Sequence, residues 1–315
     1  MGQKAYDILI VGGGVIGSSI AYHLLNDGLD GTVAVLEKDP SYEFASTPRS
    51  MGGVRQQFST EINIRIGLYG IEAIERFDDE MAVDGERAHA YYYPRGYLFL
   101  ADENNWETLQ KQYRLQRSLG VDVDLLTPEE VKDMLPHMNV ECLLGASFGR
   151  RAGYLDAYGL LRGYQRKAKS LGAKYIQAEV VEILRQKDRV HGVRTLKGEV
   201  LEGASVVIAA GPWAAEVGAM AGVELPVEPT LRMAFCFDPA EKFDYDLPFT
   251  FHPQGQWFRH ESGKQVVTGK DRNETPGFRF DWDRQYFEEE LWPRLAGLIP
   301  SFERLKLIRG WGGLY

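Results

Sequence analysis

Apolar residues near the start of the chain follow two different spacings in succession. Residues 6–11, which end in the apolar run Ile8-Leu9-Ile10-Val11, are predicted to form a short buried strand. Residues 15–26 carry apolar side chains at helical spacing, and 32–36 is a second apolar run rich in β-branched residues. Asp27-Gly28 lies between them and ends the helix. The pattern therefore predicts a strand–helix–strand unit.

Three further helices are predicted from their start signals. Thr60 precedes the first, Thr127-Pro128-Glu129-Glu130 is a capping box that opens the second, and Asp156 caps the third. Periodicity places Ile62, Ile66, Ala73 and Phe77 together on the inner side of the first of these helices. The polar segment 39–58 before it is predicted to be a long ordered loop.

The second half of the chain is richer in strands. They are predicted near 174–184 and 189–195, with a return strand at 205–209. An antiparallel meander at this point differs from a nicotinamide-binding domain, in which strand and helix continue to alternate. Aromatic-rich strand texture covers 91–100 and much of 220–300. Because the two textures alternate along the chain, we expect discontinuous domains.

The composition indicates a folded, acidic protein. Hydrophobic residues make up 44% of the 315 residues, which is enough for a buried core. The formal net charge of −9 disfavours nucleic acid and anionic membranes as main partners. Cys142 and Cys236 have neither metal-site spacing nor a disulfide pattern, and no apolar stretch is long enough to span a bilayer. We expect a cytoplasmic protein without a metal site or a transmembrane segment.

The residues Gly12-Gly13-Gly14-Val15-Ile16-Gly17 match the pattern G-x-G-x-x-G between a predicted strand and a predicted helix. Glu37 ends the next strand, 20 residues after Gly17. Gly12 allows the tight turn, Gly14 lets the backbone approach a pyrophosphate, and Gly17 lets helix and strand pack closely. Amides at the helix start attract phosphates, and Glu37 can accept hydrogen bonds from both ribose hydroxyls. This context predicts a dinucleotide site.

The motif alone permits NAD or FAD. The meander and the strand that ends in Ala209-Ala210-Gly211 favour FAD, since that end brings a second bare backbone to the cofactor. The predicted fold class is α/β plus α+β: an FAD-binding Rossmann-like domain with a β-meander, and a substrate domain built on an antiparallel sheet. We assign 1–88, 146–218 and 301–315 to the FAD-binding domain, and 89–145 and 219–300 to the substrate domain.

These residues resemble the D-amino-acid oxidase superfamily of flavoproteins, and within it the branch of glycine oxidase, sarcosine oxidase and dimethylglycine dehydrogenase. The segments that carry the resemblance are Asp7–Ala21 with Glu37, Ser46–Phe58, Tyr154–Leu161, Val207–Trp213 and Arg309–Tyr315. Together they span nearly the whole chain. Family chains continue past the last of these segments with residues that close over the flavin, so the resemblance implies that this chain is truncated at its C-terminus.

The resemblance also implies which residues hold FAD. Loop 46–53 would lie along the pyrophosphate and beside the isoalloxazine ring, and the backbone of Val181 would hold the adenine. The expected FAD contacts are Gly12, Gly14, Val15, Ile16, Gly17, Glu37, Lys38, Ser46, Thr47, Ser50, Met51, Gly52, Gly53, Val181, Ala210, Gly211, Trp213 and Gly313. None of the six histidines lies in the loop through which some relatives attach flavin, so histidyl attachment is not expected, while cysteinyl attachment stays open.

The reaction implied by the resemblance is oxidation of a C–N bond by hydride transfer to flavin N5. The substrate would be a small amine or amino acid, such as sarcosine, glycine or proline. A substrate carboxylate calls for an arginine, and Arg259 is the leading candidate, followed by Arg55 near the flavin face and by Arg232. The expected catalytic residues are Arg55, Arg259, Trp257 and Tyr315; a structural role is the alternative for each arginine, and Trp257, Tyr97 and Tyr315 form either an aromatic cage or core.

Two other functions remain open at the level of the sequence. One is oxidation of a 2-hydroxy acid or of glycerol 3-phosphate, which normally needs a positioned base for the hydroxyl proton. The other is a non-catalytic flavin-binding assembly factor or subunit. The electron acceptor is equally open between oxygen, a quinone and a partner subunit.

Overall fold

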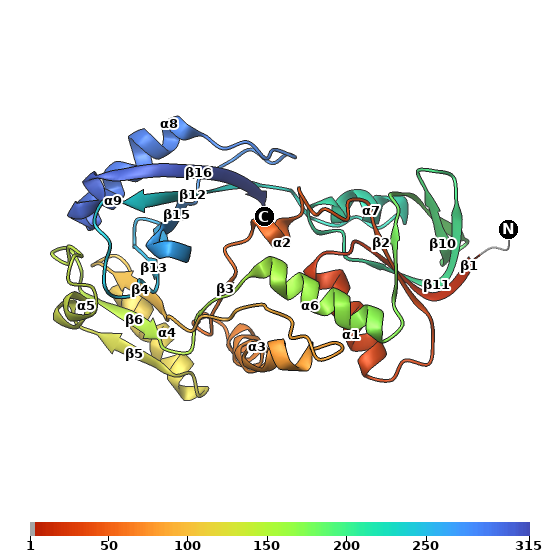
Figure 1. Cartoon of the computed structure of the whole chain (residues 1–315), viewed down its shortest axis with the longest axis horizontal. Helices are drawn as coiled ribbons and strands as arrows, with labels where there is room; N and C mark the ends of the chain where they lie inside the picture. The colour runs from red at the N-terminus through yellow and green to blue at the C-terminus, as the bar shows by residue number, and fades with distance from the viewer. Residues whose placement is uncertain (1–3) are drawn as a thin grey trace.

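The computed structural model describes residues 4–315 and shows an elongated molecule with two lobes (Figure 1). Residues 1–3, which belong to the predicted segment 1–88, lie outside the described residues. The C-terminal end of the chain lies near the junction of the two lobes. Within residues 4–315, no helix has both the length and the apolar character needed to cross a membrane.

The first lobe is built on a six-stranded sheet with the strand order β8-β2-β1-β11-β10-β9. The strands are β1 Lys4–Val11, β2 Val33–Glu37, β8 Lys174–Gln177, β9 Val180–Gln186, β10 Arg189–Thr195 and β11 Val200–Ile208. Strands β8, β2, β1 and β11 run parallel, whereas β9, β10 and β11 form an antiparallel meander. This arrangement confirms the predicted Rossmann-like architecture with a β-meander.

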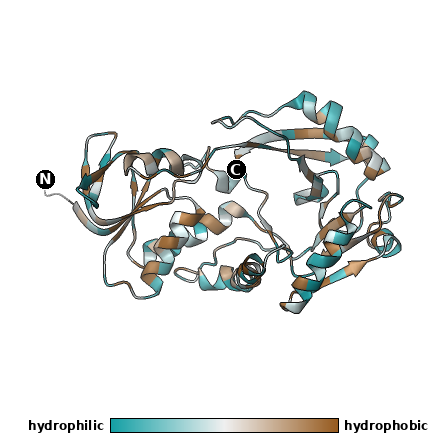
Figure 2. Cartoon of the chain, turned by 180° about the vertical axis from the view of Figure 1, so that it is seen from behind, coloured by the Kyte–Doolittle hydropathy of each residue, from teal (hydrophilic) through white to brown (hydrophobic). Residues whose placement is uncertain are grey.

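Helices cover both faces of this sheet: α1 Val15–Asn26, α6 Ala157–Ser170 and α7 Ala214–Met220. Successive side chains of a strand point to opposite faces. Ile10 accordingly packs on the face of α1 and α6, whereas Leu9 and Val11 pack on the face of α7. Hydrophobic and hydrophilic residues alternate along the helices that border this lobe, as Figure 2 shows, because each helix has only one buried side.

Helix α3 (Glu61–Glu80) differs from the periodicity-based prediction. Ile62 and Ile66, which we expected on the inner side, are 64% and 61% exposed. Its buried residues are Ile64, Ile71 and Phe77, and each belongs to a different apolar cluster. The prediction of the inner side was therefore wrong at the start of the helix, because three separate partners along α3 decide which residues are buried.

The second lobe is built on an eight-stranded sheet with the order β16-β12-β15-β14-β13-β4-β6-β5. Its strands are β4 Tyr97–Ala101, β5 Val123–Leu126, β6 Gly145–Gly149, β12 Leu231–Pro239, β13 Phe249–Phe251, β14 Gln256–His260, β15 Val266–Lys270 and β16 Leu305–Leu314. The pairings are antiparallel except that between β13 and β4. A largely antiparallel second sheet was predicted.

Helices and short turns complete this lobe: α4 Trp106–Ser118, α5 Pro128–Met134, α8 Arg284–Tyr286, α9 Trp292–Leu298, η2 Ser262–Lys264, η3 Phe287–Leu291 and η4 Pro300–Glu303. Two predicted helix starts are confirmed in the molecule. Thr127 and Glu130 form the capping box of α5, and Asp156 caps α6 by accepting the N–H of Tyr158.

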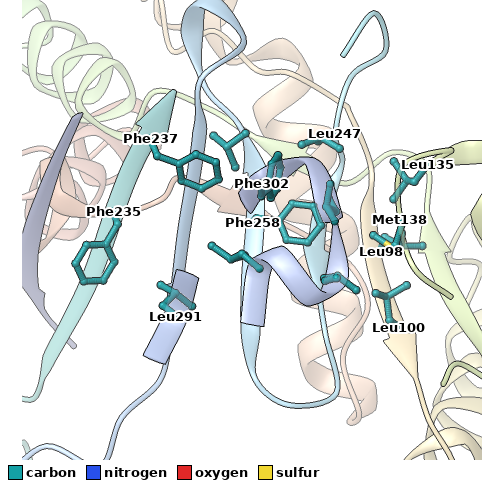
Figure 3. Packing of buried hydrophobic residues seen from close by; sticks show 14 of the residues in the cluster. Leu98, Leu100, Leu135, Met138, Phe235, Phe237, Leu247, Phe258, Leu291 and Phe302 are labelled. Carbon is teal, nitrogen blue, oxygen red and sulfur yellow. The ribbon is translucent and has the colours of Figure 1, made fainter. Parts of the chain in front are cut away.

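One face of the eight-stranded sheet carries the largest apolar core (Figure 3). Phe235, Phe237, Phe258 and Phe302 are fully buried there together with Leu98. The alternation along β4 turns Tyr97 and Phe99 to the opposite face, which looks toward the junction of the lobes. The second lobe therefore has an aliphatic and phenyl core on one side and an aromatic surface on the other.

The junction contains the short helix α2 (Ser46–Arg49) and a two-stranded sheet of β3 (Gly53–Val54) and β7 (Gly153–Tyr154). The predicted domain limits stay a proposal. Strands β6 and β16, from segments that we assigned to the FAD-binding domain, are hydrogen-bonded within the eight-stranded sheet. The end of β16 nevertheless reaches α2, so this strand contacts both lobes.

Candidate functional site

The glycine motif makes a turn that only glycine can make. Gly12 has φ +104°, and a Cβ on it would lie 2.3 Å from the carbonyl oxygen of Ala209. A Cβ on Gly17 would lie 1.9 Å from the carbonyl oxygen of Gly12. The end of β1, the start of α1 and the residue after β11 therefore meet backbone to backbone, as the sequence pattern predicted.

The start of α1 faces the loop that follows β2. Gly14 is the N-cap of α1 and has no side chain with which to cap the first amides. The hydroxyl of Thr47 accepts the N–H of Val15 at 3.3 Å, so the loop touches the helix start directly. Backbone amides and the partial positive charge of a helix start favour a phosphate group at this place.

Glu37 lies beside the same turn. Its Oε2 accepts the N–H of Gly13 at 2.7 Å, and its Oε1 accepts the N–H of Asp39 at 2.9 Å. These two bonds hold the carboxylate at the carboxyl end of β2, next to the glycine turn. This is where a ribose lies when the pyrophosphate sits on the start of the helix.

Tyr42 supports this region and was missed by the sequence analysis. Its buried hydroxyl accepts a hydrogen bond from Gln165 at 3.1 Å and lies beside Gly13. Burial, with a smaller effect of the Glu37 charge, raises the pKa of the Tyr42 hydroxyl. No motif marks this residue, because its place depends on how α6 packs against the loop.

A second backbone segment reaches the turn after β11. Ala209 donates its N–H to the carbonyl of Val11 at 2.8 Å, and the turn η1 (Gly211–Trp213) follows. Gly211 has φ +53° and open space around its Cα, so ligand can approach it closely. The amine of Lys38 lies 3.6 Å from the centre of the Trp213 ring. Val181, the expected adenine contact, is 40% exposed on β9.

Loop 46–53 joins the two lobes. The Ser46 hydroxyl donates a hydrogen bond to the carbonyl of Leu314 at 2.7 Å, and the Ser50 hydroxyl accepts one from the N–H of Gly52 at 3.0 Å. A Cβ on Gly52 would lie 2.1 Å from the carbonyl oxygen of Leu155, and one on Gly53 would lie 2.0 Å from the Tyr97 hydroxyl. The two glycines therefore allow the loop to pass between the lobes.

Arg49 is a second residue that the sequence analysis missed. Its guanidinium donates to the carbonyl of Gly312 at 2.6 Å and to that of Glu43 at 2.6 Å. The indole N–H of Trp311 returns a hydrogen bond to the Arg49 carbonyl at 3.1 Å. Gly313, an expected flavin contact, lies beside the Arg49 side chain. These bonds join α2 to the end of β16.

The three candidate arginines have different surroundings. Arg259 is buried; it donates to the carbonyls of Met51 at 3.2 Å and His260 at 2.7 Å, and it pairs with Glu261 at 3.2 Å. Arg232 pairs with Asp271 at 3.2 Å. Among residues 4–315, Arg55 has no hydrogen-bond or ion-pair partner, and its guanidinium lies over aromatic rings.

Two of those rings, Tyr97 and Phe99, belong to the aromatic face of the second sheet, whereas Phe58 lies between β3 and α3. The guanidinium carbon of Arg55 is 4.6 Å from the Phe58 ring centre, 5.3 Å from Phe99 and 5.9 Å from Tyr97. The remaining members of the face are Phe249, Phe251 and Trp257. Burial raises the pKa of the Tyr97 hydroxyl, which keeps it protonated at neutral pH. Tyr315 is 88% exposed.

The geometry defines a dinucleotide-dependent oxidoreductase. An uncapped helix start, a bare glycine turn, a positioned carboxylate and a second backbone at Ala209–Gly211 fit the ADP half of FAD. The individual contacts of each expected residue stay predictions.

The chain belongs to the FAD dependent oxidoreductase (DAO) family, whose model matches residues 7–315. FAD-dependent oxidoreductase domain-containing protein 1 of Bos taurus is 32% identical over 98% of this chain and 71% of its own length. Sarcosine oxidase subunit beta of Arthrobacter sp is 27% identical over 99% of this chain and 76% of its own length. The crystal structure of L-proline dehydrogenase from P. horikoshii superimposes with a TM-score of 0.89 at 27% identity, covering 100% of this chain and 82% of that one.

These findings confirm the predicted family, fold class and cofactor. The protein is an FAD-dependent oxidoreductase. The resemblance stated from the sequence motifs thus extends over the full described chain.

Proposed function

We propose that this protein oxidises the C–N bond of a small amino acid whose nitrogen is a secondary or primary amine, with sarcosine-like and proline-like compounds as the leading class. Two of the similar proteins are a sarcosine oxidase subunit and an L-proline dehydrogenase, and both names specify an amino acid with a secondary amine. FAD, when bound, supplies the hydride acceptor for this reaction. The protein has to bind, orient and desolvate the substrate.

The surroundings of the Arg55 side chain are the main support for this proposal. Arg55 follows directly after Gly53-Val54, it is half-buried, and its donors have no acceptor among the described residues. A cation held in this way is suited to a substrate carboxylate, because a charge-assisted, bidentate bond positions a small anion well. The two Nη groups of Arg259 are directed at Met51, His260 and Glu261, while its buried Nε has no partner among the described residues. We therefore assign the carboxylate to Arg55 and not to Arg259, the first candidate from the sequence.

The aromatic face supports an amine with an apolar body. Tyr97, Phe99 and Phe251 lie in stacked or tilted contact, with ring centres 5.0–5.9 Å apart. Such a surface excludes water and packs against methyl or ring carbons. A neutral amine next to the flavin would need no strong base, which agrees with the lack of a free histidine at this face in the described chain.

The test is anaerobic reduction of the FAD-loaded protein, followed at the flavin absorption band. We expect bleaching by sarcosine or proline, and none by lactate or glycerol 3-phosphate. Bleaching by the hydroxy compounds alone would support the alternative oxidation of a C–O bond. Failure of every amine in a broad panel would contradict the proposal and favour a flavin-binding subunit.

The Arg55 assignment is tested with a matched pair of substrates, proline and pyrrolidine, which differ by the carboxylate. Arg55→Met should weaken apparent binding of the amino acid by about 10- to 100-fold, because one charge-assisted bond is lost. Its effect on pyrrolidine should be within a factor of about 2. Arg194→Met, which removes an exposed arginine of the meander, is the control. An equal effect on both substrates would exclude a carboxylate contact.

A further inference from the structure

The segment 271–283, which we call the aromatic strap, joins β15 to α8 and lies against the first lobe. Its two neighbouring elements both belong to the second lobe. The ring of Phe278 stacks on Trp213, with centres 5.2 Å apart and planes at 20°. The ring of Phe280 lies 4.7 Å from that of Phe44. The loop before α8 extends toward the junction of the lobes in Figure 1.

Two cations lie between or over these rings. The Lys38 amine lies 3.6 Å from the centre of the Trp213 ring, on which Phe278 also stacks. The guanidinium of Arg49 is 5.4 Å from each of Phe44 and Phe280. A cation near the face of an aromatic ring is attracted by the ring quadrupole. The strap thus contacts the rest of the chain through the Phe278–Trp213 stack and through the contacts of Phe280 with Phe44 and Arg49.

The residues under the strap border the ADP half of the FAD site. Lys38 directly follows Glu37, whose carboxylate holds the glycine turn. Trp213 ends the turn that begins at Gly211. Arg49 is the last residue of α2, whose Thr47 touches the start of α1. The strap therefore rests on three different segments around one ligand position.

The strap has internal bonds of its own and lies at the surface of the molecule. Gly277 donates its N–H to the carbonyl of Pro229 at 2.7 Å, and Glu274 pairs with Arg279 at 2.6 Å and with Arg272 at 3.2 Å. Phe278 keeps 41% of its surface exposed. Because Phe278 lies at the surface, this part of the strap can lift from Trp213 without opening an apolar core, while Trp282 stays packed on Phe235.

We propose that the aromatic strap is a retention device for FAD: it closes over the ADP half of the bound cofactor and must lift before FAD can enter or leave. Its residues take no part in the oxidation. The strap sets how long the cofactor stays bound, through contacts of Phe278 and Phe280 with the first lobe.

The test compares FAD release from three loaded proteins: the unmodified chain, Phe278→Ala/Phe280→Ala, and Tyr91→Ala. Release is followed by the rise of free flavin fluorescence after dilution. The double variant should release FAD about tenfold faster or more, since two aromatic contacts are lost. Tyr91 is an exposed aromatic residue away from the strap, so its variant should release FAD at the unmodified rate. Phe278→Tyr/Phe280→Tyr should restore slow release.

A second measurement does not depend on release. Chymotrypsin cleavage within the strap should slow several-fold when FAD is bound to the unmodified chain, because a closed strap does not fit the protease. Release from the double variant within twofold of the unmodified rate would overturn the proposal. Strap cleavage that is independent of FAD would overturn it as well.

Discussion

At the scale of single residues, burial decides chemistry more than residue type does. Two neighbours in β14 illustrate this. Arg259 donates to the Met51 carbonyl and pairs with Glu261, so a residue that looks like a substrate anchor in the sequence fastens loop 46–53 to the second lobe. His260, on the other side of the strand, accepts the N–H of Leu247 at 3.0 Å and is 3% exposed. Its role is structural, because its ring is buried and bonded to the backbone of Leu247.

His260 makes the stability of the protein depend on pH. Burial, together with the nearby Lys264, lowers the pKa of this imidazole from 6.5 to about 4. The unfolded chain therefore binds the proton first, and the free energy of unfolding falls as the pH drops from 6.5 toward 4. The loss from this one group is about 3 kcal/mol, at 1.36 kcal/mol per pKa unit.

The measurement is urea unfolding at a series of pH values for the unmodified chain and for His260→Asn. The asparagine oxygen can still accept the Leu247 N–H, but it does not titrate. We expect a flatter dependence of the unfolding free energy on pH in the variant. Equal slopes in the two proteins between pH 6.5 and 4 would show that another group is responsible.

At the scale of elements, α3 shows how one helix serves both lobes. Its first buried residue, Ile64, packs with Val121 and Val123, while its last, Phe77, packs with the cluster of α1 and α6. Between them, Gly67 lies against the backbone of Arg55. The helix therefore packs against the segment that contains Arg55, the proposed substrate-binding residue.

Two glycines of α3 provide a matched test of this contact. A Cβ on Gly70 would meet nothing within 4 Å, so Gly70→Ala should raise the free energy of unfolding by about 0.5–1 kcal/mol. A Cβ on Gly67 would lie 2.7 Å from the Arg55 carbonyl oxygen. Gly67→Ala should therefore lower the free energy of unfolding by about 1–3 kcal/mol relative to Gly70→Ala, since the Arg55 backbone has to move.

Chemical denaturation gives both values, and amine titration of the flavin band reports on Arg55. We expect the Gly67 variant to bind the amino acid more weakly and the Gly70 variant to bind it normally. Equal stability and equal binding in the two variants would mean that α3 does not support Arg55.

At the scale of the whole molecule, the residues predicted to hold the cofactor come from both lobes. The glycine turn and Glu37 belong to the first sheet, whereas loop 46–53 is fastened to β16 and β14 of the second sheet. A ligand that binds only the folded arrangement stabilises it by mass action. FAD should therefore stabilise the chain as a unit and not one lobe alone.

FAD at 100 times its dissociation constant should raise the free energy of unfolding by about 2.7 kcal/mol. Riboflavin at the same concentration should give a much smaller shift, because it lacks the ADP half that the glycine turn and Glu37 accept. Thermal unfolding of the apoprotein with each ligand measures both effects. Equal shifts would mean that the ring alone supplies the binding energy.

Much of the first lobe follows from local sequence. The turn at Gly12–Gly17 and the carboxylate at Glu37 are local requirements, because one backbone conformation and one spacing satisfy them in any surroundings. The caps of α5 and α6 are local for the same reason. The family, the cofactor and the two kinds of sheet could therefore be predicted from the chain alone.

Contacts between distant segments cannot be predicted from any local sequence pattern. The inner side of α3, the buried hydroxyl of Tyr42 and the fastening of Arg49 to Gly312 each depend on a partner far away along the chain. Arg55 and Arg259 look alike in the sequence, and only the packing of the two lobes distinguishes them. The guanidinium of Arg55 has no acceptor among the described residues, whereas that of Arg259 is directed at Met51. Local stereochemistry thus determines the ADP half of the site, whereas long-range packing determines which side chains face the substrate.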